Sequence, residues 1–296
     1  MPRYYIFASD PHGTGQPWID LVKQAQKDYP DSQTIFGGDY IDGNKHSEET
    51  VDFVMNQVQN HHAQALKGNH EQLMEDFVDH NDDLWYYNGA KTTIKSFFDR
   101  GFSKHTARYK LRMDDRYTFL INLPKIIETD HFIFVHAGIA CWTKNYRDHE
   151  IYKNRAPLFS LMDGQDYFYL WSRENYWYGD GEYYVFAHNI TGKTIVTGHT
   201  PTTYIEGIYD NNQDGIEPTF DYEQGPGDDP KIVHRACPVR KVQYEGEAPR
   251  YFTDGGCHGN NDHHGNVCVF DNKTGLLVKT YNSDTGDIKF VPHDDF

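Results

Sequence analysis

The sequence lacks a long apolar run, has few cysteines and is short of positive charge. No apolar run approaches the ~18 residues that a membrane span needs, and Asp10 comes too early for a secretory signal. We therefore expect a cytoplasmic protein with no membrane partner. Four cysteines form no Cys-x-x-Cys pair, which argues against a thiolate zinc site or a dense disulfide framework and predicts reduced thiols. With 28 Lys and Arg against 44 Asp and Glu, the net charge of -16 argues against nucleic acid binding.

The chain does contain many aromatic residues and a pattern of alternating strands and helices. Aromatic residues make up 15% of its 296 residues, which is typical of a folded protein. Short apolar runs alternate with helical spacing in the first half, as in an α/β sheet. The pattern predicts strands at 3–9, 34–37, 64–66, 117–122, 131–135, 194–197, 266–270 and 275–281. It predicts helices at 17–27, from 47 to about 58, at 71–79 and at 84–98, the last divided at Asn88-Gly89.

We predict a single domain over residues 1–296. Residues 206–250 are rich in Gly, Asp, Pro and Asn and have little periodicity, which predicts a long, loop-rich excursion rather than a second core. Many aromatic residues lie between positions 167 and 184. We interpret them as core, and a stacking platform for a base or a phosphotyrosine ring is the alternative.

Polar motifs follow the predicted strands where those strands end. In an open α/β sheet, ligands bind beyond the carboxyl ends of the strands, so motifs distant in sequence can converge at one edge. Any one motif could equally be a turn or a helix cap, but five in this order favour a shared site. The motifs are Asp10-Pro-His12, Gly38-Asp39-Tyr-Ile-Asp42, Gly68-Asn69-His70-Glu71, His136-Ala-Gly138 and Gly198-His199-Thr200.

The side chains of these motifs form a donor set for metal ions. Two carboxylates, one carboxamide and three imidazoles suit Mn, Fe or Zn rather than copper. Asp10 and His12 are two residues apart in an extended segment, where alternate side chains share a face and reach one ion. Asp39 has two carboxylate oxygens and can bridge to a second ion. The remaining ligands of that second ion are then Asn69, His136 and His199.

These residues carry a resemblance to a known family. Residues 38–42, 66–71 (Leu-Lys-Gly-Asn-His-Glu), 135–138 (Val-His-Ala-Gly) and 197–201 (Thr-Gly-His-Thr-Pro) occur in a characteristic order. Through these motifs and their order, the sequence resembles the calcineurin-like metallophosphoesterases. Within them it resembles the phosphoprotein phosphatase branch, which contains the bacterial and phage serine/threonine phosphatases. Weaker matches are Leu-Trp-Ser-Arg at 170–173 and Thr-Asp-Gly-Gly-Cys at 253–257. The resemblance spans residues 5–201 and, loosely, 251–281.

The resemblance implies a fold, a cofactor and a mechanism. The fold would be a two-sheet β-sandwich flanked by helices, in four α/β/β/α layers. Asp10, His12 and Asp39 would hold one metal ion, and Asp39, Asn69, His136 and His199 a second; Mn is expected, with Fe or Zn as alternatives. Two ions roughly 3.5 to 4 Å apart can clamp a phosphate and turn the bridging water into a hydroxide nucleophile. His70 would be the general acid, oriented and kept protonated by Asp42.

The sequence departs from the family pattern in the expected phosphate clamp. The family has an arginine and then a glycine after Asp42, whereas this chain has Gly43-Asn44-Lys45. Lys67 stands where relatives carry an arginine, and we expect it to contact substrate without the bidentate fork of a guanidinium. Arg173 is the expected remaining clamp, with both a catalytic and a substrate-binding role. Its alternative is a surface arginine packed on Trp171.

Three functions follow, in order of preference. The first is a metal-dependent phosphomonoesterase, acting on phosphoserine or phosphothreonine proteins or on small phosphoesters. The second is a dinucleoside polyphosphate hydrolase, because bacterial diadenosine tetraphosphatases resemble the same motif series. The third is a metal-holding interaction module without catalysis, which the presence of all six ligands and His70 disfavours. The sequence does not indicate the oligomeric state.

Overall fold

The computed structural model describes residues 1–153, 162–172, 187–202, 222–224, 230–234, 239–258, 265–282 and 289–291. Some residues discussed above lie outside these ranges: Arg173, Cys237 and the aromatic residues between 176 and 184.

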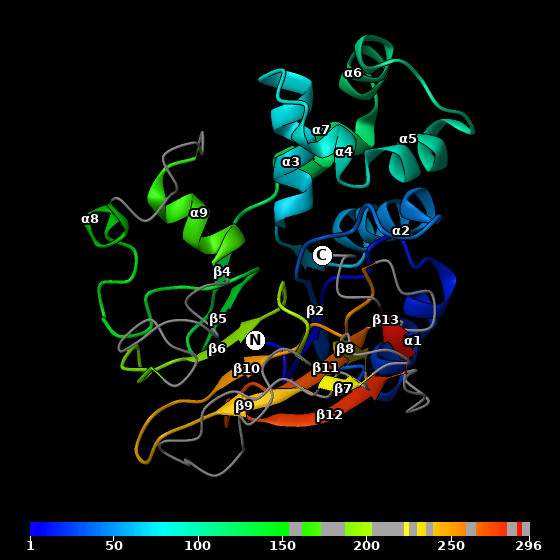
Figure 1. Cartoon of the computed structure of the whole chain (residues 1–296). Helices are drawn as coiled ribbons and strands as arrows, with labels where there is room; N and C mark the ends of the chain where they lie inside the picture. The colour runs from blue at the N-terminus through cyan, green and yellow to red at the C-terminus, as the bar shows by residue number, and fades with distance from the viewer. Residues whose placement is uncertain are drawn as a thin grey trace.

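Two five-stranded sheets form the centre of the molecule (Figure 1). In the first, β1 pairs in parallel with β2 and antiparallel with β11, and in the second, β6 pairs in parallel with both β5 and β10. The first sheet has the order β12 (Leu277–Asn282), β11 (Asn266–Asp271), β1 (Tyr4–Ala8), β2 (Ser32–Phe36) and β3 (Gln64–Ala65). The second has the order β4 (Ile126–Glu128), β5 (Phe132–Val135), β6 (Thr194–Thr197), β10 (Arg250–Phe252) and β9 (Arg240–Val242).

Alternation of side chains along the strands separates the core into layers. Tyr5 and Phe7 of β1 pack with Phe132 and Phe134 of β5 in a cluster between the two sheets. Their neighbours point the other way, because successive side chains of a strand face opposite sides of the sheet. Ile6 therefore packs in a cluster with the helices outside the first sheet, and residues 133 and 135 pack outside the second. The predicted four-layer α/β/β/α sandwich is thereby confirmed.

Helices cover both outer faces (Figure 1). Buried side chains from α1, α2, α3, α4, α5, α6 and α7 share the cluster outside the first sheet, and those from α8 and α9 share the cluster outside the second. The helices are α1 (Gln16–Asp28), α2 (Ser47–Asn60), α3 (Asn69–Asp79), α4 (Leu84–Tyr87), α5 (Ala90–Phe98), α6 (Lys104–Arg112), α7 (Asp115–Ile121), α8 (His149–Tyr152) and α9 (Gly164–Trp171). The predicted division at Asn88-Gly89 is confirmed, since Gly89 has a left-handed φ of 106° between α4 and α5.

The strand predicted at 117–122 is wrong, because these residues belong mostly to the helix α7. A short apolar run does not distinguish a buried strand from a buried helix by periodicity alone. The Asp114 side chain accepts a hydrogen bond from the Arg116 N–H and caps the helix. Tyr117 and Leu120, three residues apart, then supply its buried face.

The segment 206–250 contains strands that the sequence analysis did not predict. β7 (Tyr222–Gln224) and β8 (Pro230–His234) form a three-stranded sheet with β13 (Lys289–Val291), in the order β13-β8-β7. β9 joins the second central sheet by pairing antiparallel with β10. β7 pairs with β8, and β9 with β10, over a short stretch of chain, whereas β13 pairs with β8 from far along the chain. β7, β9 and β13 have only three residues each, too few positions for a periodicity to show.

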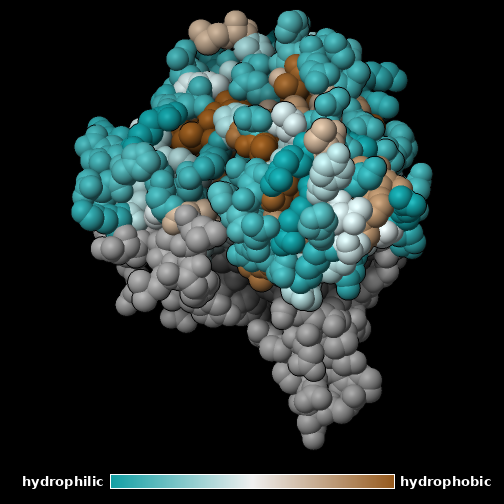
Figure 2. Space-filling view, turned by 90° about the horizontal axis from the view of Figure 1, so that it is seen from above, coloured by the Kyte–Doolittle hydropathy of each residue, from teal (hydrophilic) through white to brown (hydrophobic). Residues whose placement is uncertain are grey.

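The described surface and thiols agree with the composition. The face seen from above in Figure 2 is mostly hydrophilic, with scattered apolar residues. Exposed large hydrophobic side chains among the described residues include Tyr87 and Met113. Among the described residues, no helix is both long and apolar enough to cross a membrane. Cys141, Cys257 and Cys268 are buried, and in the described part of the aromatic stretch Phe168, Tyr169 and Leu170 are core residues.

Candidate metal centre

The two sheets meet at the ends of their parallel strands, and the predicted ligands lie there. Two hydrogen bonds join the sheets at this edge. The His136 ring Nδ1 lies 2.8 Å from the Gly37 carbonyl, and the His199 backbone N–H donates to Asp10 Oδ1 over 3.0 Å. Asp10 and His12 follow β1, Asp39 follows β2, Asn69 and His70 begin α3, His136 follows β5 and His199 follows β6.

One donor group consists of Asp10, His12 and Asp39. A ligand atom from each lies within 4.8 Å of the others, and all three side chains are buried. The His12 ring Nδ1 lies 3.2 Å from the Ile41 carbonyl, which leaves its Nε2 on the side of Asp39, 3.5 Å away. Asp10 Oδ2 is buried and accepts no hydrogen bond from any described residue. A buried carboxylate oxygen needs a partner, and a bound cation would provide one.

A second donor group consists of Asp39, His136 and His199, again within 4.8 Å and buried. Asn69 adjoins it, because Asn69 Oδ1 lies 2.9 Å from His136 Nε2. Asp39 belongs to both groups, which is the position that a bridging ligand must occupy. The structure thus brings all six predicted ligands together in the predicted division, and their oxygen and imidazole donors fit two divalent ions.

The groups perturb one another's protonation strongly. Burial raises the pKa of Asp10 well above its ordinary value, and the Asp254 carboxylate adds to the shift. Burial alone would also raise the pKa of Asp39, but the imidazoles, led by His136, outweigh it and hold that pKa well below its ordinary value. Burial opposes the charged form of His136, but Asp39 raises its pKa to about 9. Without metal, protons compensate the charge that two cations would otherwise neutralise.

The backbone at the site is held in a rarely used conformation. Asp10, His12, Asp39 and His199 all have positive φ, between 43° and 68°. Non-glycine residues adopt this left-handed region at a cost of about 1–3 kcal/mol each, and such strain concentrates at functional sites. Gly198 has no such strain and serves by lacking a side chain, because a Cβ there would overlap Asp10 Oδ2.

His70 lies beside both donor groups in a network centred on Asp42. The His70 ring Nδ1 is 2.7 Å from Asp42 Oδ2. Burial by itself would lower the pKa of His70, but the charges of Asp39 and Asp42 outweigh it and raise that pKa to about 9. Two further donors hold the same carboxylate: the Trp85 indole N–H at 2.7 Å and the Thr93 hydroxyl at 2.5 Å. The network fixes the ring of His70 with a proton on it. The sequence analysis missed Trp85 and Thr93, because they lie on α4 and α5, far along the chain.

Glu71 is another residue whose role the sequence analysis missed. Its carboxylate accepts hydrogen bonds of 2.9 Å from the backbone N–H groups of Gly68, Asp39 and Tyr40. It thereby joins the β2 loop to the start of α3. Burial raises its pKa to about 7, and the Asp39 charge contributes. Its place three residues after Gly68, in the first turn of α3, is the available signal, because an acidic residue there closes a capping box.

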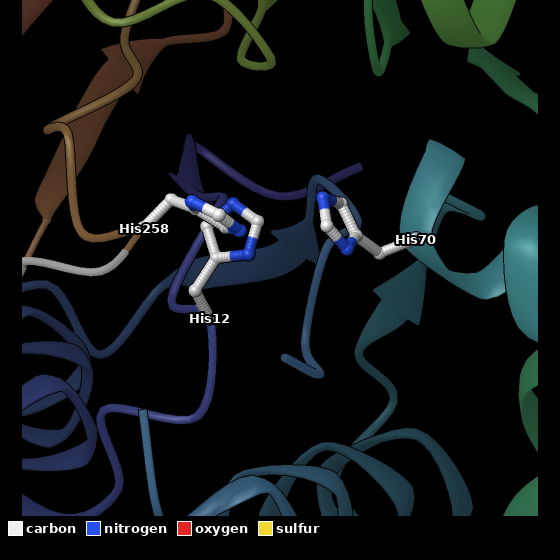
Figure 3. A group of neighbouring side chains, drawn as sticks. All are labelled: His12, His70 and His258. Atoms are coloured by element: carbon white, nitrogen blue, oxygen red, sulfur yellow. The ribbon is translucent and has the colours of Figure 1, made fainter. Parts of the chain in front are cut away.

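The two predicted substrate contacts have different outcomes. Lys67 is buried, and its ammonium pairs with Glu75 of α3. It lies along a pocket that it shares with Gln72 and Lys125, and none of the six predicted ligands lines that pocket. Arg173 lies outside the described residues. A further residue that the sequence analysis did not single out, His258, approaches His12 and His70 (Figure 3).

The sequence profile described as calcineurin-like phosphoesterase matches residues 4–214. The chain belongs to this family, and it is a metallophosphoesterase, a hydrolase acting on phosphoester bonds. The family uses a dinuclear centre of divalent metal ions, and the two donor groups that share Asp39 are the candidate place for it. No curated protein sequence matches the chain significantly.

Solved structures align with the chain at low sequence identity, and the first two of the three named here support the same fold. The cold-active protein-tyrosine phosphatase of a psychrophilic Shewanella species aligns with a TM-score of 0.52 and 14% identity, covering 98% of this chain and 80% of the other. A candidate diadenosine tetraphosphatase aligns with a TM-score of 0.50 and 14% identity, covering 97% and 96%. A protein serine/threonine phosphatase from Saccharomyces cerevisiae aligns with a TM-score of 0.48 and 15% identity, covering 100% and 82%.

Proposed function

We propose that the chain hydrolyses phosphate monoesters and acts on phosphoserine or phosphothreonine in proteins. The observation that carries this proposal is the 2.7 Å contact between His70 Nδ1 and Asp42 Oδ2, next to two donor groups that share Asp39. The contact keeps a proton on an imidazole that is not itself in the predicted ligand set. An enzyme needs such a group when the departing oxygen is strongly basic.

The six ligands would hold two metal ions, for which we propose Mn; Fe and Zn suit the same donors. When bound, these ions supply positive charge for the phosphoryl oxygens and lower the pKa of the attacking water. The residues of the chain hold the donor groups in position. Asp39 holds the two donor groups together, and Glu71 holds the loop that carries Asp39 against the start of α3.

His70 supplies the proton for the leaving group in this proposal. Its Nδ1–H donates to Asp42, and the opposite nitrogen, Nε2, carries the second proton of the imidazolium. With a pKa of about 9 the ring keeps both protons near neutral pH. A departing serine alkoxide is a strong base and must be protonated as it leaves, whereas a departing nucleoside phosphate is a weak base. The network around Asp42 therefore favours monoesters of alcohols.

A dinucleoside polyphosphate hydrolase is the second candidate function. The observation in its favour is that Gly43 and Asn44 replace the arginine and glycine expected after Asp42 in protein phosphatases of this family. The ion pair of Lys67 with Glu75 weakens the protein phosphatase assignment further. Lys67 stands where relatives carry an arginine, and its ammonium is already paired with a carboxylate.

Leaving-group dependence tests the proposal. We expect the Mn-loaded wild type to hydrolyse a phosphoserine peptide, and His70→Asn to keep its metal but lose about 10²- to 10⁴-fold in kcat on that peptide. The loss should be smaller with para-nitrophenyl phosphate, whose leaving group needs less protonation. Turnover of diadenosine tetraphosphate with an inert phosphopeptide would favour the second function. Equal losses on both monoesters would show that His70 does not act as the acid.

A further inference from the structure

His258 lies against the two histidines that border the candidate metal centre. His12, His70 and His258, here called the histidine cluster, each offer a ring nitrogen within 4.8 Å of the other two. The ring centroid of His258 is 4.7 Å from that of His12 and 5.2 Å from that of His70. Figure 3 shows the three rings gathered from three separate segments, the loop after β1, the start of α3 and the loop after β10.

The backbone before His258 is anchored, so the position of the ring is built into the fold. The Asn44 side-chain amide donates to the Cys257 carbonyl over 3.0 Å. The backbone N–H of Asn44 donates to the His12 carbonyl over 2.8 Å, so one buried residue ties together the segments that carry His12 and His258. On the other side of Cys257, the Gly256 N–H donates to Asp254 Oδ1 over 2.8 Å.

The histidine cluster extends from the buried donor groups to the surface of the protein. His12 is buried and belongs to a donor group with Asp10 and Asp39, whereas His258 is exposed. Among the described residues, the donor groups that contain these two carboxylates do not include His258. His258 therefore lies at the exposed end of the cluster, beside the imidazole of His70.

A phosphoryl group bound over two cations still has an oxygen that points away from them and needs an N–H donor. Lys67 forms an ion pair with Glu75, and Gly43 has no side chain that could donate a hydrogen bond. An imidazole ring carries at least one N–H in either protonation state. From these contacts we propose that His258 is a substrate-binding residue that donates a hydrogen bond to the phosphoryl group, and that Asn44 is its positioning residue.

The inference rests on the proposed function, but inorganic phosphate tests it without turnover. The Mn-loaded wild type, His258→Ala and His258→Asn are compared for phosphate affinity by calorimetry, for metal content and for KM and kcat on para-nitrophenyl phosphate. A hydrogen bond to a charged group corresponds to about a 10- to 100-fold change in affinity. We expect the affinity for phosphate to fall and KM to rise by roughly tenfold or more in both variants. Both variants should retain two metal ions and show a smaller change in kcat.

His105→Gln is the matched control, because His105 is an exposed histidine on α6 and its substitution should change none of these quantities. Asn44→Ala should weaken phosphate binding in the same direction, by less than His258→Ala, with metal content unchanged. Loss of a metal ion in His258→Ala would overturn the proposal by making His258 a ligand. Unchanged phosphate affinity would overturn it as well. If the wild type binds phosphate but hydrolyses no monoester, the proposed function fails and the binding comparison still decides the role of His258.

Discussion

The two donor groups of the candidate metal centre share Asp39 but differ in charge. The first combines two carboxylates with one imidazole, and the buried Asp254 carboxylate acts on it from nearby. The second combines one carboxylate with two imidazoles and the amide of Asn69. In the absence of metal, burial raises the pKa of Asp10 in the first group and favours its protonated form, and Asp39 raises the pKa of His136 in the second group to about 9. Two ions bound here must displace these different protons, so we expect the two groups to bind metal unequally.

The largest effect is expected from Asp39→Asn, which removes the charge that the two groups share. The substitution keeps the size of the side chain, and Asn tolerates the positive φ of 57° at this position. Substitutions of partners outside the ligand set typically cost 10- to 100-fold in metal affinity. We expect a loss of at least about 100-fold for both ions, with activity at background, measured by metal titration and phosphatase assay.

Asp99→Asn is the matched control for this prediction. Asp99 has nearly the same φ, 58°, but it is exposed at the end of α5. Its substitution should leave metal content and activity unchanged. Retention of one tightly bound ion in Asp39→Asn would contradict the bridging position.

A smaller and selective effect is expected from Gly198→Ala. The added Cβ would overlap Asp10 Oδ2 and lie close to Ser9 Oγ, so it displaces a ligand of the first group. We expect the first ion to bind about 10- to 100-fold more weakly and the second to change less, measured by manganese stoichiometry at limiting metal. Gly101→Ala is the control, because nothing lies within 4 Å of a Cβ there. Equal loss of both ions would contradict the separation of the groups.

The smallest effect is expected from pH in the metal-free protein. The pKa values of His70 and His136 are raised to about 9, so their contribution to stability is present below about pH 6.5 and is lost as pH rises through 9. Glu71, whose pKa is raised to about 7, acts in the same direction. We expect the melting temperature to fall on the order of 5 °C between pH 6.5 and 9.

Manganese should flatten this pH dependence, because it replaces the proton on the ligand His136. Thermal unfolding with a chelator and with saturating manganese makes the comparison. A metal-free melting temperature that rises over this pH range would show that the raised pKa values do not govern stability there.

The sequence indicated most of the site because its signals are local. A strand that ends in a polar residue beside glycine is visible in a few residues, as at Asp39 and His199. The parallel pairing of β1 with β2 and of β5 with β6 then carries such residues to one edge. The same local evidence failed for residues 117–122, where an apolar run fits a helix as well as a strand.

The sequence by itself determined the donor types, their order along the chain and the class of chemistry, because these depend on residue identity and on local spacing. Only the tertiary structure decided which partners surround them. Trp85 and Thr93 reach Asp42 from separate helices, Lys67 is engaged by Glu75, and Asn44 connects the segments of His12 and His258. Such contacts join residues up to 213 positions apart. No local pattern encodes them, because they exist only once the two sheets and their helices have packed.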